Sequence, residues 1–586
     1  MTPYANFSFP LNIYAAMLAW SEGRVDYLHY GLFECVDEPI WQAQERASAQ
    51  LWAQMPPPCR VLEVGIGLGH TLKQLHERGF NAVGITPEAA QVAEVRAQQG
   101  AGLAIEMITL EAYAPTGPRF DLMVLQESAQ YIQPLALFEA ADRLLNSEHA
   151  TLLVMDEFAL HRRSDADFGL HLLPHFKELA TRHGWRLVHE QDVTAQARLT
   201  IDVLQALTQT HWQRSQEELD IGEDELQALM QSNDRYGANY RDCIFGYRVL
   251  KFERAAAPSL RPVALDESRA PAVRALFQRV FGRELGLAEW HWKYGNGRGR
   301  GIGLAQRDGR LQAFYGGLTR PLRLFGQPAL GCQVCDVMVE PGTHGSLARQ
   351  GPMQQVAATF LEAEIGWARP HAVGFGFPTD RALGVAERLG LYRRVDEMVQ
   401  LRWVALKQLT LEGCVDRIDL AGMQPGDELW QVLDTLWAAM AQGLEASVLG
   451  VRDPAWLRYR YGQKPDVVYT ALLVRAAPGT RFMGLVVIRA HADRLEVLDL
   501  LGPLADLPNL IEATRHAAST SADAAGRTHV TCWVTVSHAA LLMRMGDGVV
   551  RDNLDLFVPA NAHTPGVSPE ALSGRWFLTA GDTDFR

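Results

Sequence analysis

Residues 60–71 read RVLEVGIGLGHT, and this stretch decides the fold of the first part of the chain. Its apolar half predicts a buried parallel strand, and its glycines predict a sharp turn that leads into a helix over residues 71–78. Glycine is needed at such a turn because the backbone takes positive φ and comes within contact distance of a ligand, which a Cβ atom would obstruct. A strand, a glycine-rich turn and a helix in this order are typical of nucleotide-binding sites.

Two details distinguish this turn from a dinucleotide-binding one. Its third glycine, Gly69, follows the second after one residue instead of two. The next predicted strand, residues 81–86 (NAVGIT), ends in Thr86, where NAD-binding proteins carry an acid. Glu63, in the first strand, suits a ligand with an ammonium group, and no phosphate-binding lysine lies nearby in the sequence. These details favour S-adenosylmethionine (SAM), with NAD or another Rossmann ligand as the alternative.

Residues 61–69 resemble motif I of the class I SAM-dependent methyltransferases. Residues 84–91 (GITPEAAQ) are similar to the G-I/V-T-x-S-x-x-Q segment of the branch that contains the cyclopropane fatty acid synthases and related small-molecule and lipid methyltransferases. The sequence YLHYG, at 27–31, resembles the H-Y-G entry segment of that branch, which implies a catalytic role for His29 and Tyr30. The resemblance also implies a cofactor site made by Glu63, Gly65, Gly67, Gly69, Thr86 and Gln91.

The residues that follow alternate between expected strands and an expected helix. The strands are at 104–109, 120–127 and 150–158, and the helix is at 134–145. Such alternation indicates an α/β fold with a doubly wound parallel sheet, which binds ligands above the carboxyl ends of its strands. The seven-strand sheet that the resemblance implies would be completed by residues 185–193 and 245–252. A helical pattern with spaced aromatic residues over positions 1–55 predicts an N-terminal lid.

The third and fourth strands lead to further site residues. Thr109 and Leu110, just past the third strand, are expected to edge the adenine, and Glu127, at the end of the fourth, is expected to point into the same crevice. In the cyclopropane synthases the segment after the fourth strand ends in Glu-His, which helps to hold a bicarbonate base, whereas the aligned places here are Gln130 and Tyr131. This departure favours a heteroatom acceptor, such as an amine, thioether or hydroxyl, over an alkene. Alignment of that nucleophile with the methyl group is then most of the catalysis, with Glu127 and Tyr131 as further catalytic candidates.

After a short linker, residues 255–258 (AAAP), the pattern changes, and three signposts recur about 160 residues later. They are WKYG at 292–295 and YRYG at 459–462, VCDVM at 334–338 and VLDLL at 497–501, and RLG at 388–390 and RMG at 544–546. A degenerate duplication gives such a pattern. We therefore expect a methyltransferase domain at 1–254 and two similar α+β domains at 261–408 and 420–586.

Each copy runs helix, antiparallel strands, a strand that ends near proline, helix, strand and helix, which resembles the GNAT (Gcn5-related N-acetyltransferase) fold. Residues 379–392 resemble the family's N-x-x-A-x-x-L-Y-x-x-x-G-F region near the acyl-CoA thioester. The resemblance implies that Tyr392 protonates the CoA thiolate as it leaves, and the alternative is that this phenol caps the core beside a helix end. Asp336 is expected either to serve as a base or to bond to backbone.

The loop that would cradle the CoA pyrophosphate should follow Asp336 in the first copy. Residues 344–352 (HGSLARQGP) are basic and carry glycines, although they match the family pattern poorly. The candidate CoA-binding residues are Val339, Arg349 and Gly351. The counterpart in the second copy, residues 500–506, matches less well, so only the first copy is expected to bind an acyl-CoA.

Bulk composition excludes several classes of function. The net charge of −13 argues against a nucleic-acid partner, because phosphate contacts need clustered Lys and Arg. No apolar run approaches the length of a membrane span, and the first residues lack the basic region of a signal peptide, which predicts a cytoplasmic protein with no membrane partner. The seven cysteines are scattered, as in a reducing compartment. Cys332 and Cys335 have C-x-x-C spacing within an expected strand, where they would point to opposite faces, so no metal site is predicted.

The leading hypothesis is a bifunctional enzyme of small-molecule biosynthesis. The first domain would methylate an acceptor with SAM, and the second half would transfer an acyl group from acetyl-CoA or another acyl-CoA to an amine. One alternative is that the GNAT-like region transfers or decarboxylates acyl groups on an acyl carrier protein supplied by a partner. Another is that this region is catalytically silent and binds substrate or sets the oligomer. The sequence identifies neither the methyl acceptor nor the oligomeric state.

Overall fold

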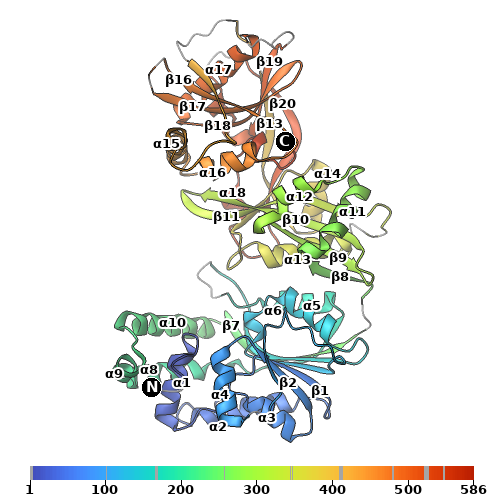
Figure 1. Ribbon diagram of the computed structural model, residues 1–586, viewed down its shortest axis with the longest axis vertical. Helices are drawn as coiled ribbons and strands as arrows, with labels where there is room; N and C mark the ends of the chain where they lie inside the picture. The colour runs from blue at the N-terminus through green and yellow to red at the C-terminus, as the bar shows by residue number, and fades with distance from the viewer. Residues whose placement is uncertain are drawn as a thin grey trace. The chain divides into compact units, whose positions relative to one another are not determined.

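The computed structural model describes residues 4–100, 102–164, 169–255, 258–343, 345, 348–407, 414–477, 479, 481–520, 527–544 and 548–586 (Figure 1). The described chain divides into two compact units, one within residues 1–264 and a second that comprises residues 265–586. Among the described helices, none is both long enough and apolar enough to cross a membrane. Parts of three sequence predictions, the linker at 256–257, the loop residues 344, 346 and 347, and the second RMG signpost at 545–546, lie outside the described residues.

The first unit is built on one seven-stranded sheet with the order β3-β2-β1-β4-β5-β7-β6. Its strands are β1 (Arg60–Val64), β2 (Asn81–Thr86), β3 (Ile105–Met107), β4 (Leu122–Gln126), β5 (Thr151–Ala159), β6 (Trp185–Asp192) and β7 (Phe245–Arg254). The pairings of β1 to β5 are parallel, whereas β7 runs antiparallel to both β5 and β6. Every predicted strand is therefore present, but β3 is shorter than its prediction and the seventh strand breaks the expected parallel arrangement.

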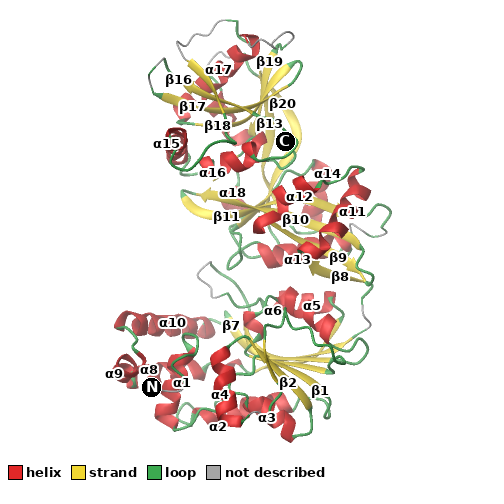
Figure 2. Ribbon diagram, in the orientation of Figure 1, coloured by secondary structure: helices red, strands yellow, loops and turns green. Residues whose placement is uncertain are grey.

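Helices cover both faces of this sheet, with α5 and α6 on one face and α3 on the other (Figure 2). The helices between the strands are α3 (His70–Glu77), α4 (Ala89–Gln99), α5 (Pro134–Leu144) and α6 (Leu173–Arg182). The N-terminal region holds α1 (Leu11–Glu22) and α2 (Ile40–Trp52), as its pattern predicts. Between β6 and β7 the chain forms α7 (Thr194–Ala197), α8 (Leu199–Thr210), α9 (Trp212–Leu219) and α10 (Glu223–Arg241), and α1 packs against this group.

The second unit begins with a repeat that we call the first repeat, residues 265–404. Its elements are α11 (Ala270–Phe281), α12 (Leu287–Tyr294), β9 (Gly299–Gln306), β10 (Leu311–Leu324), β11 (Gln327–Val339), α13 (Pro352–Glu364), β12 (Val373–Phe375), α14 (Asp380–Arg388) and β13 (Tyr392–Val404). The antiparallel strands β9, β10 and β11 are followed by β12, which pairs in parallel with β11. A bulge in β11 opposite Tyr315 turns the backbone of Asp336 to a φ of 48°.

The second repeat, residues 414–586, follows the same order. Its main elements are β14 (Cys414–Ile418), α15 (Glu428–Gly443), β15 (Val448–Gly450), α16 (Pro454–Leu457), η4 (Arg458–Gly462), β16 (Thr470–Arg475), β17 (Phe482–Ala490), β18 (Arg494–Leu501), α17 (Leu507–Thr520), β19 (His529–Thr535), η6 (Val536–Leu542), β20 (Val550–Asn561), α18 (Pro569–Leu572), β21 (Trp576–Phe577) and η7 (Ala580–Asp582). The bulge recurs in β18 next to Asp499. Where α14 stands in the first repeat, the second has only the 3-10 helix η6.

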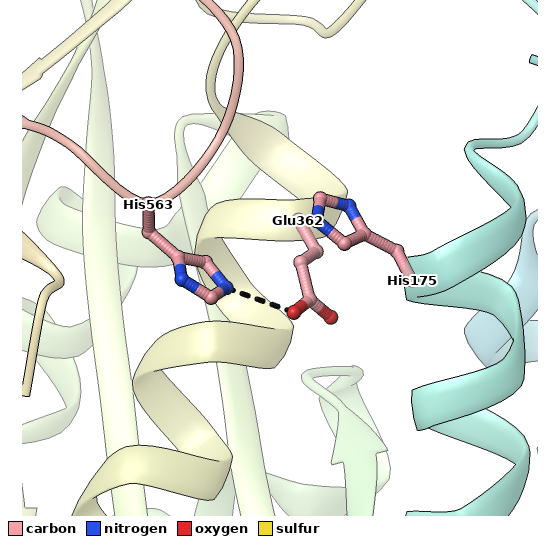
Figure 3. A group of neighbouring side chains, drawn as sticks. All are labelled: His175, Glu362 and His563. Carbon is pink, nitrogen blue, oxygen red and sulfur yellow. Dashed lines mark hydrogen bonds and ion pairs between the residues drawn. The ribbon is translucent and has the colours of Figure 1, made fainter. Parts of the chain in front are cut away.

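The two repeats are joined by exchanged strands. β13, the last strand of the first repeat, lies between β19 and β20 in the sheet of the second repeat, and β15 and β21 extend the sheet of the first. The segment after β20 is tied to α13 by a hydrogen bond of 2.9 Å between His563 Nε2 and Glu362 Oε1 (Figure 3). Neither repeat therefore completes its own sheet, so the two fold as one structural unit.

A symmetric contact marks the centre of this pairing. The indole Nε1 of Trp292 donates to the main-chain oxygen of Tyr459 at 3.2 Å, and the hydroxyl of Tyr459 donates to the main-chain oxygen of Trp292 at 2.8 Å. The two rings stack with centroids 5.3 Å apart. Because these residues begin the WKYG and YRYG signposts, equivalent positions of the two copies meet across a local two-fold relation.

Candidate functional site

The glycine-rich turn of the first unit has the backbone that its sequence predicts. Gly65, Gly67 and Gly69 take φ values of 81°, 52° and 72°. A Cβ on Gly65 would lie 2.5 Å from Ser128 Cβ, and one on Gly69 would lie 2.6 Å from Val95 Cγ1. A Cβ on Gly67 would meet nothing nearer than 3.9 Å. The outer glycines therefore allow close packing, and Gly67 faces free space in which a ligand can approach the backbone.

Glu63 lies beside this turn with an unsatisfied carboxylate. The residue is 6% exposed, and its Oε2 has no hydrogen-bond partner among the described residues. Burial raises the pKa of Glu63 to about 8. A buried carboxylate without a partner is costly, and a ligand ammonium would satisfy it, so the residues present fit the amino-acid end of SAM.

The other predicted cofactor residues lie at the ends of β2 and β3. Thr86 Oγ1 donates to Gln91 Oε1 at 3.1 Å and accepts from the amide of Glu88 at 3.3 Å, which fixes the turn after β2. Thr109 Oγ1 accepts from the amide of Ala112 at 3.4 Å, and Leu110 is buried. These residues stand at the carboxyl edge of the sheet.

Glu127 is the centre of a partly buried polar group at the same edge. It follows directly after β4 with a φ of 53°, and its Oε1 accepts from the amide of Tyr30 at 2.6 Å and from the hydroxyl of Tyr247 at 2.5 Å. The rings of Tyr30 and Tyr247 stack 5.7 Å apart. Burial, and then the charge of Glu157, raise the pKa of Glu127 well above its ordinary value. Two predicted catalytic candidates, Tyr30 and Glu127, are thus brought together.

Two further acids join this group and were missed by sequence reasoning. Asp156 and Glu157 are buried in β5, and burial raises their pKa values to about 7 and about 8. Asp156 Oδ2 accepts from the amide of Gln130 at 3.1 Å, and Glu157 accepts from the hydroxyl of Tyr240. The available signal was the pair of adjacent acids inside an otherwise apolar strand. A proton shared among such carboxylates can be accepted or released near neutral pH.

The remaining catalytic candidates of this unit differ in their surroundings. His29 is buried, its Nδ1 donates to the main-chain oxygen of Tyr30 at 2.8 Å, and burial lowers its pKa to about 4. His29 is therefore neutral at pH 7 and holds the backbone of the entry segment. Tyr131 is 79% exposed on the short helix η1 (Ala129–Tyr131), which leaves its predicted role without a contact to support it.

In the first repeat, a cavity opens where two parallel strands separate. The pairing of β11 with β12 ends at Gln333 and Phe375, and the residues that follow on both strands line a cavity of about 370 Å³. Its other walls come from α11, α12, α14 and the start of β13, together with Tyr315, Met353, Pro559, Asp584 and Phe585. Tyr392 lines the cavity, and its hydroxyl accepts from that of Tyr315 at 3.0 Å. Burial raises the pKa of Tyr392 well above its ordinary value, so the phenol keeps its proton.

A group of charged side chains lines part of this cavity. Lys293 Nζ is 2.9 Å from Asp336 Oδ1 and 2.9 Å from Asp584 Oδ2, and Tyr294 donates to Asp336 Oδ2 at 2.7 Å. Asp336 therefore pairs with side chains, which differs from its predicted alternative of bonding to backbone. Cys335 is close enough to Asp336 and Asp584 for a shared metal ion, but the Lys293 ammonium stands between the two carboxylates.

The predicted CoA-binding residues lie outside the lining of this cavity. Gly351 is the N-cap of α13, where free helix amides can face a phosphate, and Arg349 is exposed in the loop before it. Val339 ends β11. Residues 344, 346 and 347 of that loop lie outside the described residues, so the cradle predicted there stays a prediction.

The equivalent place in the second repeat is filled by protein. Tyr461 donates to Asp499 Oδ2 at 2.9 Å, as Tyr294 does to Asp336. Arg452 Nε donates to Asp499 at 2.8 Å, and Arg452 also pairs with Asp582 of η7. A Cβ on Gly581 would lie 2.9 Å from the oxygen of Leu498, so the segment 578–582 packs directly on the bulge.

No protein-family model and no curated protein matches this chain. Among solved structures, this chain is similar to the cyclase SpnF. The alignment covers 42% of this chain and 94% of SpnF, with 17% sequence identity and a TM-score of 0.36. The alignment with the cyclopropane synthase MmaA2 from Mycobacterium tuberculosis covers 43% of this chain and 96% of MmaA2, with 15% sequence identity and a TM-score of 0.34. A third similar structure is a conserved protein of unknown function from Enterococcus faecalis, described as a probable N-acyltransferase. That alignment covers 52% of this chain and 72% of the other protein, with 12% sequence identity and a TM-score of 0.40.

Proposed function

We propose that the first unit is a SAM-dependent methyltransferase that acts on a heteroatom of a small molecule. The observation that carries this proposal is Glu63, whose buried and unpaired carboxylate oxygen stands beside a glycine turn with an open face at Gly67. An NAD-type ligand would need an acid at the end of β2, where this chain has Thr86.

The residues at the carboxyl edge of the sheet divide the work. Bound SAM supplies a methyl group on a sulfonium centre, which is open to attack by a nucleophile. Glu63 holds the ammonium end, Gly67 lets the backbone approach, and Thr86 with Gln91 shapes the turn that faces the ribose. Glu127, partly exposed and with its pKa raised by burial, accepts the proton that the acceptor heteroatom gives up.

Calorimetric titration of the whole protein with SAM tests this proposal. The variant Glu63→Gln is expected to bind SAM about tenfold to a hundredfold more weakly, because a charge-assisted hydrogen bond is lost. The exposed Glu77→Gln, on α3, is the matched control and should bind as the wild type does. Absence of SAM binding, or binding of NAD instead, would overturn the proposal.

The pH dependence of binding gives a second measure. In the protein without a ligand, burial raises the pKa of Glu63 to about 8, so most of this carboxyl group is protonated at neutral pH. It must lose that proton to bind an ammonium group. Between pH 6 and pH 7.5 the affinity of the wild type should therefore rise by about tenfold relative to Glu63→Gln, which cannot titrate. Equal slopes for the two proteins would exclude Glu63 as the ammonium ligand.

We also propose acyl transfer from an acyl-CoA to an amine in the first repeat, because its cavity brings the Tyr392 phenol to the place where two parallel strands separate. Tyr392→Phe should lower turnover with acetyl-CoA by about a hundredfold, since the leaving thiolate loses its proton donor. Tyr131→Phe, which changes an exposed phenol of the first unit, is the control. Activity only with carrier-bound acyl groups would favour the carrier alternative, and a silent module would show no transfer to either.

A further inference from the structure

We propose that the cavity of the first repeat binds a primary amine with an apolar body, and that Asp584 of the second repeat is the residue that holds its ammonium. Part of the second repeat would thus complete the site of the first. The amine would serve as the acceptor in the acyl transfer proposed above: the ammonium gives one proton to Asp584, the neutral nitrogen attacks the thioester carbonyl, and Tyr392 protonates the departing thiolate and regains a proton from the new amide nitrogen. This role rests on that function, but binding of the amine can be measured alone.

Among the charged side chains that line the cavity, carboxylates outnumber cations by one, and the nearby Lys464, which lies outside the lining, has its pKa lowered to about 7 by burial. Lys293 is shared by two carboxylates, at 2.9 Å from Asp336 Oδ1 and 2.9 Å from Asp584 Oδ2. The other two charged residues of the lining, Arg283 and Glu289, pair with each other at 3.5 Å. A carboxylate that shares its one cation with another carboxylate, in a poorly solvated cavity, favours the binding of a second cation.

Of the two carboxylates, Asp584 is the one that can take another donor. Both oxygens of Asp336 accept hydrogen bonds, from Lys293 and from Tyr294. The carboxylate of Asp584 accepts one hydrogen bond from the described residues, which Lys293 donates to Oδ2. Its side chain keeps 12% of its surface exposed and lines the cavity, so Oδ1 can accept an N–H donor from a ligand there.

The rest of the lining suits an apolar body. It is formed mainly by aromatic and aliphatic side chains: Phe277, Phe281, Met353, Phe377, Leu383 and Phe585. Burial of alkyl or aryl surface there contributes about 25 cal/mol per Å². An anionic head group would be repelled by the excess carboxylate, so an alkylammonium or arylalkylammonium ion is the class that fits both ends.

The second repeat supports the assignment by contrast. Its equivalent aspartate, Asp499, receives both Arg452 and Tyr461, and the guanidinium of Arg452 also reaches Asp582. Arg320 adds a second cation to Asp582 at 3.1 Å. There, two cations face two carboxylates and the charges balance, whereas the cavity of the first repeat has one cation for its two.

The test uses the full chain and three probes of equal length: n-hexylamine, 1-hexanol and hexanoate. Calorimetric titration should give the amine at least a tenfold lower Kd than the alcohol, and hexanoate should bind most weakly. Asp584→Asn should remove the preference for the amine over the alcohol, and Asp584→Glu should restore part of it. Asp380→Asn, an exposed acid on α14, is the control and should keep the wild-type preference.

Thermal unfolding of each variant shows whether it is folded, because Asp584→Asn removes one partner of Lys293. Tighter binding of hexanoate than of hexylamine, or an unchanged preference in a folded Asp584→Asn protein, would overturn the proposal. If hexylamine binds as expected but no acyl transfer occurs, the transferase function fails and the amine site stands. If acyl transfer to other amines proceeds while hexylamine fails to bind, this inference alone fails.

Discussion

The two repeats of the second unit share one hydrogen bond and differ in what faces it. Tyr294 reaches Asp336 at 2.7 Å in the first repeat, and Tyr461 reaches Asp499 at 2.9 Å in the second. In the first, the strands beyond this pair enclose a cavity, whereas in the second the segment 578–582 lies against it. The difference shows that the same tyrosine–aspartate hydrogen bond can border an open cavity in one repeat and a packed segment of chain in the other.

In the second repeat, the place equivalent to the cavity holds a buried ion-pair network that ties neighbouring segments together. Arg452 is fully buried and uses all three nitrogens, to Asp499, to the oxygen of Gly450 and to Asp582. Arg452 holds the pKa of Asp582 below its ordinary value, although burial alone would raise it. Such a network tolerates no missing partner, since a buried charge left alone costs several kcal/mol.

The largest expected effect comes from removal of the central cation of each repeat. Arg452→Met leaves Asp499 and Asp582 buried with too little compensation, and the free energy of unfolding should fall by about 3–5 kcal/mol. Lys293→Met removes the cation of the open repeat, where water in the cavity can solvate the two carboxylates, so a loss of about 1–3 kcal/mol is expected. Urea unfolding followed by tryptophan fluorescence measures both. Equal losses would break the distinction between a filled and an open site.

Much of the fold could be predicted because its signals are local. The turn at Gly65, Gly67 and Gly69 has the positive φ values that the motif requires, and each predicted strand of the first sheet is present. The helices between β6 and β7 were not predicted. The buried face of α10 includes Asn233 and Gly237 as well as leucines, so its apolar periodicity is weak.

The candidate sites divide in the same way. Glu63 and Glu127 could be proposed from the sequence because both lie next to a recognisable strand end. Glu63 precedes the glycine turn after β1, and Glu127 directly follows β4. Asp584 could not be proposed in this way, because its meeting with Lys293, about 290 residues away in sequence, depends on exchanged strands and on the path of the chain after β21. Sequence spacing carries no information on such non-local contacts.

A smaller effect is expected from a methyl group added to the filling segment. In Gly581→Ala the new Cβ would lie 2.0 Å from the Tyr461 hydroxyl and 2.9 Å from the Leu498 oxygen. The segment must shift, which should cost about 1–3 kcal/mol of unfolding free energy. Gly384→Ala, on α14 of the open repeat, is the matched control. Its Cβ would meet nothing within 4 Å, so a gain of about 0.5–1 kcal/mol from helix propensity is expected. Similar results for both variants would mean that the segment does not fill the site tightly.

The smallest effect is a difference in cysteine reactivity between the repeats. Cys335 lines the cavity, whereas Cys532 is fully buried in β19, and burial raises the pKa of both thiols. Iodoacetamide at pH 8.5 should therefore modify both slowly compared with the exposed Cys35, because only the thiolate reacts. Cys335 should still react several-fold faster than Cys532, since the reagent can reach it without unfolding, and hexylamine should slow Cys335 alone. Peptide mass spectrometry over time separates the three rates. If Cys335 and Cys532 react equally and hexylamine protects neither, both sites open only by unfolding, and the contrast between the repeats disappears.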